Sequence, residues 1–156
     1  MNRGAGKDLL GPLSALLPGS LLVTPSAMSD ASDAKGAYAL LVHLCAPCEF
    51  VIRGKSLSLL AGWHVYVGSA RGPGGMRARL CRHFRPQKPI HWHIDRLTMV
   101  ADDMLALALG GGVECDIAAR LAGSGLFEHV LPGFGSSDCK TCPSHLLVPR
   151  TLPSAQ

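Results

Sequence analysis

The sequence predicts a small mixed α/β domain in which a short antiparallel central sheet is flanked by helices. Two observations predict this class: several short segments have the apolar and β-branched character of strands, and two others repeat their apolar residues about every four positions, as helices do. The chain has 156 residues, 47% of them hydrophobic, so it can bury one core. We expect one domain over residues 36–149, a flexible amino-terminal tail over 1–35 and a short tail over 150–156, with Met28 as an alternative start.

Five segments have the character of strands. Residues 36–44 are apolar on both faces, which is typical of a central strand. Residues 49–53 and 63–67 follow as two further short strands, so the three are expected to meander. Residues 104–109 predict another strand, and residues 146–148 an edge strand.

Two segments have a helical period. Met76, Leu80 and Phe84 recur every four residues after a glycine-rich turn, so they predict the inner stripe of a helix. Residues 113–121 show the same spacing and end at a glycine, with acids in the first turn where the helix dipole favours them. Residues 94–99 predict a short helix between these two.

The amino-terminal region has no clean period. Pro12, Pro18 and Gly19 interrupt its apolar stretch, which is therefore too short to span a membrane and only faintly resembles a secretory signal. We expect a cytoplasmic protein that does not contact membranes.

Between residues 71 and 88 the cations follow one another with no acid among them. Such a face attracts phosphate backbones, although a basic run is also often a solvated helix face. The candidate nucleic-acid-binding residues, besides Arg79, are Arg71, Arg77, Arg82, Arg85 and Lys88.

Six cysteines are present, as two CxxC pairs and two single residues. A zinc site built from Cys45, Cys48, Cys139 and Cys142 is one alternative, because structural zinc takes four soft ligands in a tetrahedral array. Pairs this far apart in the sequence make such sites less often than compact ones. We therefore expect reduced, metal-free thiols.

An ordered set of short motifs resembles the GIY-YIG nuclease superfamily over residues 36–147. The residues that carry the resemblance are Gly36-Ala-Tyr38, Tyr66-Val-Gly68, Arg79 with His83 on a helix, and Glu114 on a later helix. The strings YVGSA at 66–70, HWHID at 91–95, EC at 114–115 and GFGSSDC at 133–139 resemble an uncharacterised branch, which is met alone or fused to an endonuclease III-type DNA glycosylase.

The resemblance implies an endonuclease that depends on Mg²⁺ or Mn²⁺, acts on DNA or structured nucleic acid, and has a DNA-repair glycosylase as a possible partner. Glu114 would hold the Mg²⁺ and Arg79 would clamp the phosphate, while Tyr38, Tyr66 or His83 would handle the proton of the attacking water. A tyrosine with an ordinary pKa of about 10 is a poor base, so it would need positive charge nearby, which Arg79 can provide.

Further residues within the same motifs are candidates for the cleft: Gly68, Ser69, His91, His93, Asp95, Ser137 and Asp138. Two other functions remain open. One is a nucleic-acid-binding module of the same fold without turnover, and the other is a zinc-stabilised interaction domain. Taken singly, strand tyrosines are commonly core residues, and a first-turn glutamate commonly serves only the helix dipole.

Overall fold

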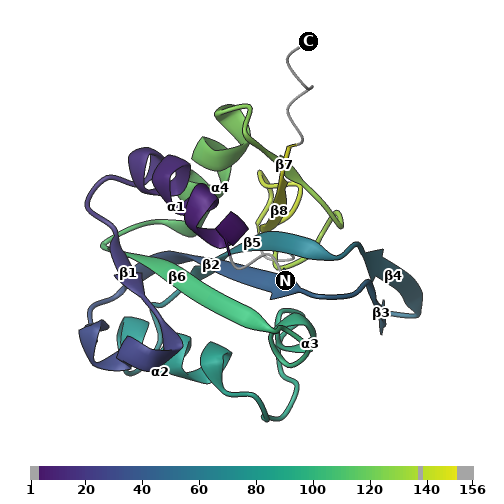
Figure 1. Cartoon of the computed structure of the whole chain (residues 1–156), viewed down its shortest axis with the longest axis horizontal. Helices are drawn as coiled ribbons and strands as arrows, with labels where there is room; N and C mark the ends of the chain where they lie inside the picture. Colours follow the sequence, from purple (N-terminus) through teal and green to yellow (C-terminus); the bar gives the residue numbers. More distant parts are fainter. Residues whose placement is uncertain (1–3, 137–138, 151–156) are drawn as a thin grey trace.

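The computed structural model describes residues 4–136 and 139–150. They form three layers, in which a six-stranded antiparallel sheet lies between helices on both faces (Figure 1). This architecture confirms the predicted fold class.

The helices are α1 (Gly4–Leu16), α2 (Gly75–Phe84), α3 (Asp95–Thr98) and α4 (Glu114–Gly123), with a 3₁₀ helix η1 (Pro25–Asp30). None of the helices in the described part of the chain is long and apolar enough to cross a membrane. The strands of the large sheet are β1 (Leu21–Val23), β2 (Gly36–Leu44), β5 (Gly62–Ser69), β6 (Asp103–Gly110), β7 (Phe127–His129) and β8 (Leu146–Pro149). A separate hairpin consists of β3 (Cys48–Ile52) and β4 (Lys55–Leu59).

The strand β2 lies in the middle of the sheet, whose order is β1-β6-β2-β5-β8-β7. It is buried at almost every position and pairs with β5 on one side and β6 on the other, as the sequence predicted for 36–44. The prediction of an edge strand at 146–148 was wrong, because β8 lies between β5 and β7. The short β7, which the sequence pattern did not reveal, pairs with β8 and forms the edge of the sheet.

Alternate residues of β2 face two separate cores. Ala39 and Leu41 pack toward α1 and α4, whereas Leu40 and Val42 pack toward α2 and α3. The side chains of all four are fully buried. Helices therefore cover both faces of the sheet, which explains why β2 is apolar on both sides.

Residues 4–35 differ from the flexible tail that we expected for residues 1–35, of which residues 1–3 lie outside the described part of the chain. Leu13 and Leu17, one turn apart in and just after α1, are completely buried against the sheet. Val23 is also buried, and β1 pairs with β6 in register. The proline and glycine residues hide the helical period in the sequence, but tertiary packing still orders this region.

Two glycines allow close contacts between strands: Gly36 lets β6 approach β2, and Gly68 lets the Tyr38 ring approach β5. A Cβ on Gly36 would overlap the carbonyl oxygen of Leu109 on the neighbouring strand β6. A Cβ on Gly68 would overlap the hydroxyl of Tyr38, the residue directly opposite it on β2. The missing side chain at 68 therefore leaves room for the Tyr38 ring.

We predict that Gly68→Ala lowers the free energy of unfolding by about 1–3 kcal/mol, because the added methyl group must displace the buried Tyr38 ring. Urea denaturation of the wild type and the variant measures this loss. Gly110→Ala is the control, since a Cβ at this strand position has no atom within 4 Å. An equal loss in both variants would contradict the steric explanation.

Candidate functional site

A cleft of about 490 Å³ opens near the end of the sheet where β2 begins and where β5 and β6 end. All five side chains predicted to be catalytic line it, together with the predicted Ser69. The lining residues are Tyr38, Tyr66, Ser69, Arg79, His83, Trp92, Glu114, Cys115, Gly135, Cys139, Lys140 and His145.

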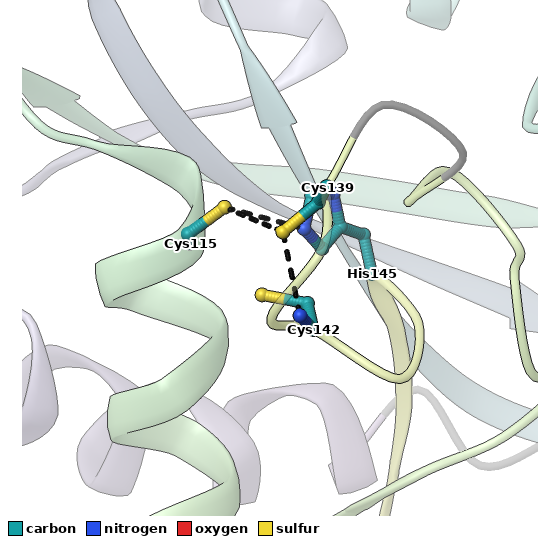
Figure 2. Close-up of side chains that lie close together, drawn as sticks. All are labelled: Cys115, Cys139, Cys142 and His145. Carbon is teal, nitrogen blue, oxygen red and sulfur yellow. Dashed lines mark hydrogen bonds between the residues drawn. The ribbon is translucent and has the colours of Figure 1, made fainter.

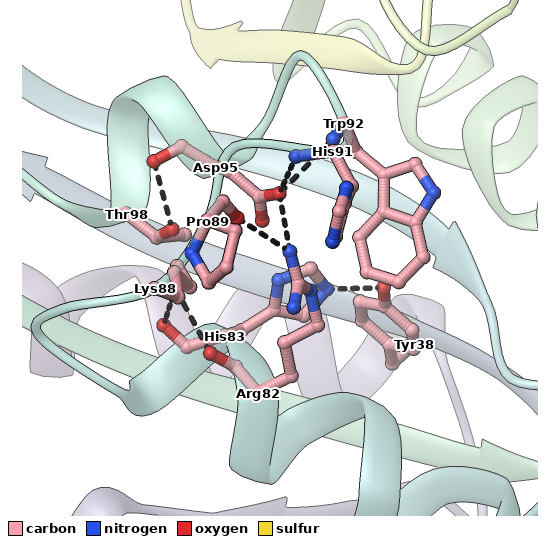
Figure 3. Close-up of polar contacts among 9 residues, drawn as sticks. All are labelled: Tyr38, Arg82, His83, Lys88, Pro89, His91, Trp92, Asp95 and Thr98. Atoms are coloured by element: carbon pink, nitrogen blue, oxygen red, sulfur yellow. Dashed lines mark hydrogen bonds and ion pairs between the residues drawn. The ribbon is translucent and has the colours of Figure 1, made fainter.

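At the base of the cleft, the hydroxyl of Tyr38 lies 2.5 Å from Nε2 of His83 (Figure 3). Both side chains are buried. Burial, followed by the positive charge of Lys88, lowers the pKa of His83 to about 3. His83 is therefore neutral at pH 7, and its Nε2 can accept the proton of the Tyr38 hydroxyl.

Both tyrosines have a raised pKa. Burial and the neighbouring Tyr66 raise the pKa of Tyr38 well above its ordinary value. Burial and the Glu114 carboxylate raise the pKa of Tyr66 to about 12. Arg79 acts in the opposite direction on both, as expected from the sequence, but burial outweighs it. Both hydroxyls are therefore protonated at neutral pH.

The guanidinium of Arg79 lies over an aromatic ring. Its Cζ is 4.2 Å from the ring centre of Trp92, and it makes no hydrogen bond or ion pair with another described residue. Stacking holds the guanidinium in place and leaves its N–H donors available for a phosphate. Trp92 was missed as a cleft residue, although its position between two histidines in HWHID was visible in the sequence.

Asp95 organises the HWHID segment from the inside (Figure 3). It is completely buried and accepts hydrogen bonds from the backbone N–H groups of His91 (2.9 Å) and Trp92 (3.0 Å) and from Arg82 (2.8 Å). Burial alone would raise the pKa of Asp95, but these hydrogen bonds from the backbone and from Arg82 lower it. Asp95 is thus a structural anchor that turns the side chain of Trp92 toward the cleft.

The expectation that His91, His93 and Asp95 line the cleft was wrong. His91 is exposed, and His93 packs against Phe134, with ring centres 5.6 Å apart, beside a different cavity. The backbone from Trp92 to Asp95 forms a turn that leads into α3, so the side chains next to Trp92 point in other directions. Gly68, another candidate, is also absent from the lining of the cleft. Ser137 and Asp138, the last two candidates, lie outside the described residues.

Most cations of the 71–88 run serve the fold. Lys88 is buried, donates to the carbonyls of Arg82 (2.9 Å) and His83 (2.8 Å), and so caps the end of α2. Burial lowers the pKa of Lys88 to about 8. Arg82 forms an ion pair with Asp95. Neither Arg82 nor Lys88 is therefore the free phosphate ligand that we expected.

Three arginines of the same run lie at the surface. Arg71 donates to the carbonyl of Gly112 (3.2 Å) and Arg77 to that of Ala31 (2.8 Å), while Arg85 is exposed just after α2. None of the three lines the cleft. Lys140, which lies outside the basic run, does line it.

Glu114 is the first residue of α4. Its side chain is 35% exposed, and its Oε2 lies 3.6 Å from Nδ1 of His145, slightly beyond hydrogen-bond length. No described residue hydrogen-bonds to this carboxylate. The Glu114 carboxylate is therefore free to bind a cation in the cleft.

A second group of potential ligands borders the cleft (Figure 2). The ligand atoms of Cys115, Cys139, Cys142 and His145 all lie within 4.8 Å of one another, so this group can hold a metal ion. The predicted combination of Cys139 and Cys142 with Cys45 and Cys48 was wrong, because Cys45 follows β2, Cys48 begins β3, and neither lies with the other two. Among the described residues, Cys45 and Cys48 join no metal-binding group.

Sequence reasoning missed Cys115 and His145 as members of this group. The spacing of Cys139, Cys142 and His145 in the chain was a possible signal for the histidine. Cys115 comes from α4, more than twenty residues earlier, and only the tertiary structure brings it to the other three.

Hydrogen bonds perturb the thiols of this group. Bonds from Thr141 and Cys115 lower the pKa of Cys139 to about 5, because they favour its thiolate form. The bond with Cys139, followed by burial, raises the pKa of Cys115 to about 12. All six cysteines are free thiols.

Residues 37–155 match the model of a protein family described as "Domain of unknown function DUF123". This match covers more than half of the chain. The chain belongs to this family. No curated protein and no solved structure matches it. The family description assigns no activity, so the cleft itself carries the functional argument.

We predict that His83 makes stability sensitive to acid. The pKa of this histidine is about 3 when folded and about 6.5 when unfolded, so the unfolded chain binds more protons between these values. The free energy of unfolding should therefore fall as the pH is lowered from 6.5 toward 3, by at most about 1.4 kcal/mol per pH unit.

Urea denaturation at several pH values tests this contribution. His83→Gln should give a shallower pH dependence than the wild type, whereas the control His91→Gln, at an exposed position, should follow the wild type. Parallel curves for the wild type and His83→Gln would show that His83 is not the group responsible.

Proposed function

We propose that this chain is a metal-dependent nuclease of the GIY-YIG kind that hydrolyses phosphodiester bonds of DNA or structured nucleic acid. One observation carries the proposal. Tyr38, Tyr66, Arg79, His83 and Glu114 come from four different elements and surround the same cleft. Their residue types match the demands of phosphodiester hydrolysis: a phosphate clamp, a carboxylate for a metal and a route for a proton.

The phosphate would bind at Arg79. Its planar guanidinium presents several N–H donors in a fixed geometry, and stacking on Trp92 restricts its movement before the substrate arrives. The exposed Lys140 adds a second positive charge to the lining of the cleft. These two cations would attract a phosphate backbone and stabilise the charge that develops on it.

The metal would bind at Glu114. Mg²⁺ is commonly held by one or two carboxylates together with phosphate oxygens of the substrate, and Glu114 offers a partly exposed carboxylate with no hydrogen-bond partner among the described residues. When bound, Mg²⁺ or Mn²⁺ supplies a Lewis acid that stabilises charge on the phosphate and acidifies a water molecule.

The proton would leave through Tyr38 and His83. A water molecule that donates to the Tyr38 oxygen can transfer its proton there while the tyrosine passes its own proton to Nε2 of His83. His83 is a weak base in the free protein, because its pKa is about 3. A phosphate bound near it would favour its protonated form and so assist this transfer.

Binding of nucleic acid without cleavage is the second candidate function. The observation that favours it is the raised pKa of both tyrosines, which leaves neither ionised at neutral pH. Binding would need only the cations of the cleft, whereas cleavage also needs Glu114.

We predict cleavage of at least one form among single-stranded, duplex and branched DNA and structured RNA in the presence of Mg²⁺ or Mn²⁺. Glu114→Gln should abolish cleavage, because the amide cannot hold the cation, and Arg79→Ala should slow it at least about 100-fold. Rates measured under single-turnover conditions report these losses.

The matched control is Asp116→Asn, which removes an exposed acid from the same first turn of α4 but not from the cleft. It should cleave like the wild type. Full activity in Glu114→Gln, or an equal loss in Asp116→Asn, would remove Glu114 from the proposed metal site. Binding without cleavage by the wild type would favour the second candidate function.

We also predict that nucleic-acid affinity falls with increasing salt and depends on Lys140. Lys140→Ala should weaken binding and reduce the slope of log K against log[salt] by about 0.9 for duplex DNA, because one phosphate contact is lost. Lys55→Ala, an exposed lysine in the β3–β4 hairpin, is the control and should leave the slope unchanged. A salt-independent affinity would argue against binding in this cleft.

A further inference from the structure

Four side chains that favour soft metals converge beside the cleft from two distant parts of the chain (Figure 2). Cys115 lies in the first turn of α4, whereas Cys139, Cys142 and His145 lie in the loop between β7 and β8. Their ligand atoms lie within 4.8 Å of one another. In a tetrahedral zinc site with ordinary bond lengths, these atoms would be about 3.6–3.8 Å apart, so small side-chain movements close the site.

The observed distances already approach this geometry. Sγ of Cys115 is 3.2 Å from Sγ of Cys139 and 3.8 Å from Nε2 of His145. In addition, the backbone N–H of Cys142 donates to Sγ of Cys139 over 3.3 Å. The CxxC turn thus directs a backbone hydrogen to a ligand sulfur, which favours the thiolate needed for metal binding.

His145 is oriented for binding through one particular nitrogen. Its ring is buried, Nε2 faces the sulfur of Cys115, and Nδ1 faces the carboxylate of Glu114 at 3.6 Å. Nδ1 has no hydrogen-bond partner among the described residues at this distance. A histidine that binds a metal through one nitrogen usually donates its other N–H to a carboxylate, and Glu114 is placed for this role.

A disulfide explains the arrangement less completely. The pair Cys115 and Cys139 is close enough to oxidise after a small movement, but one disulfide would use two of the four side chains. Cys142 and the buried His145 would then have no role in the group. A metal with four protein ligands uses all of them and leaves no open position, which is typical of a structural zinc site.

We propose that Cys115, Cys139, Cys142 and His145 bind one Zn²⁺ ion, which fastens the loop between β7 and β8 to the first turn of α4. Irregular loops of this length are uncommon in compact domains, and Gly135, Cys139, Lys140 and His145 of this loop line the cleft. The zinc site is independent of the proposed hydrolysis, because it requires neither substrate nor turnover. It also reverses the expectation of metal-free thiols.

The test uses the full chain purified without chelator from zinc-supplemented medium, in the absence of nucleic acid. Elemental analysis should find one zinc per chain, and replacement by Co²⁺ should produce the visible bands of a tetrahedral site with thiolate charge transfer. Removal of the metal should lower the melting temperature, and added Zn²⁺ should restore it. Wild-type protein without zinc and without the cobalt bands would overturn the proposal.

Variants then assign the ligands. Cys142→Ser should reduce the zinc content to less than about a tenth of the wild-type value, while Cys48→Ser, from the other CxxC pair, should keep one zinc per chain. Equal zinc loss in both variants, or a metal-free protein with Cys115 bonded to Cys139, would overturn the assignment. If Cys142→Ser does not fold, the cobalt spectra of the wild type and of Cys48→Ser still show whether the tetrahedral thiolate site exists and whether it needs Cys48. These outcomes differ from failed cleavage, because zinc content is measured without substrate.

Discussion

The candidate site depends on the pairing of β2 with both of its neighbours. β5 and β6 run antiparallel to β2, so Ser69 at the end of β5 and Gly110 at the end of β6 both lie beside the start of β2. The chain enters α2 soon after β5 and α4 soon after β6. Residues on both helices therefore surround the Tyr38 hydroxyl, although they are far apart in the sequence.

Close packing around Tyr38 gives the site its electrostatic character. Because Gly68 has no side chain, the tyrosine ring can lie across β5, and its hydroxyl meets His83 in buried surroundings. The same burial keeps His83 neutral and opposes ionisation of the tyrosine. In the free protein Tyr38 and His83 are thus a neutral pair. The charged side chains that line the cleft are Arg79, Lys140 and Glu114.

Glu114 connects the two centres that we propose. Its carboxylate lines the cleft and also faces the ring of His145, a member of the Cys₃His group. A carboxylate has enough lone pairs to accept a hydrogen from the imidazole and still face a cation in the cleft. A zinc ion held at Cys115 would therefore fix the first turn of α4 and, with it, the position of Glu114.

The sequence by itself determined the mixed α/β class, the central strand, the helices α2 and α4, and the side chains Tyr38, Tyr66, Arg79, His83 and Glu114, which proved to line one cleft. Only the tertiary structure decided the roles of Trp92, Asp95, Lys88, Cys115 and His145. Hydrophobic periodicity reports which face of a local segment is buried, so it identifies strands and helices. It does not report which cation will pair with a buried acid, or which helix a loop cysteine will contact, because those contacts join residues that are distant in the chain.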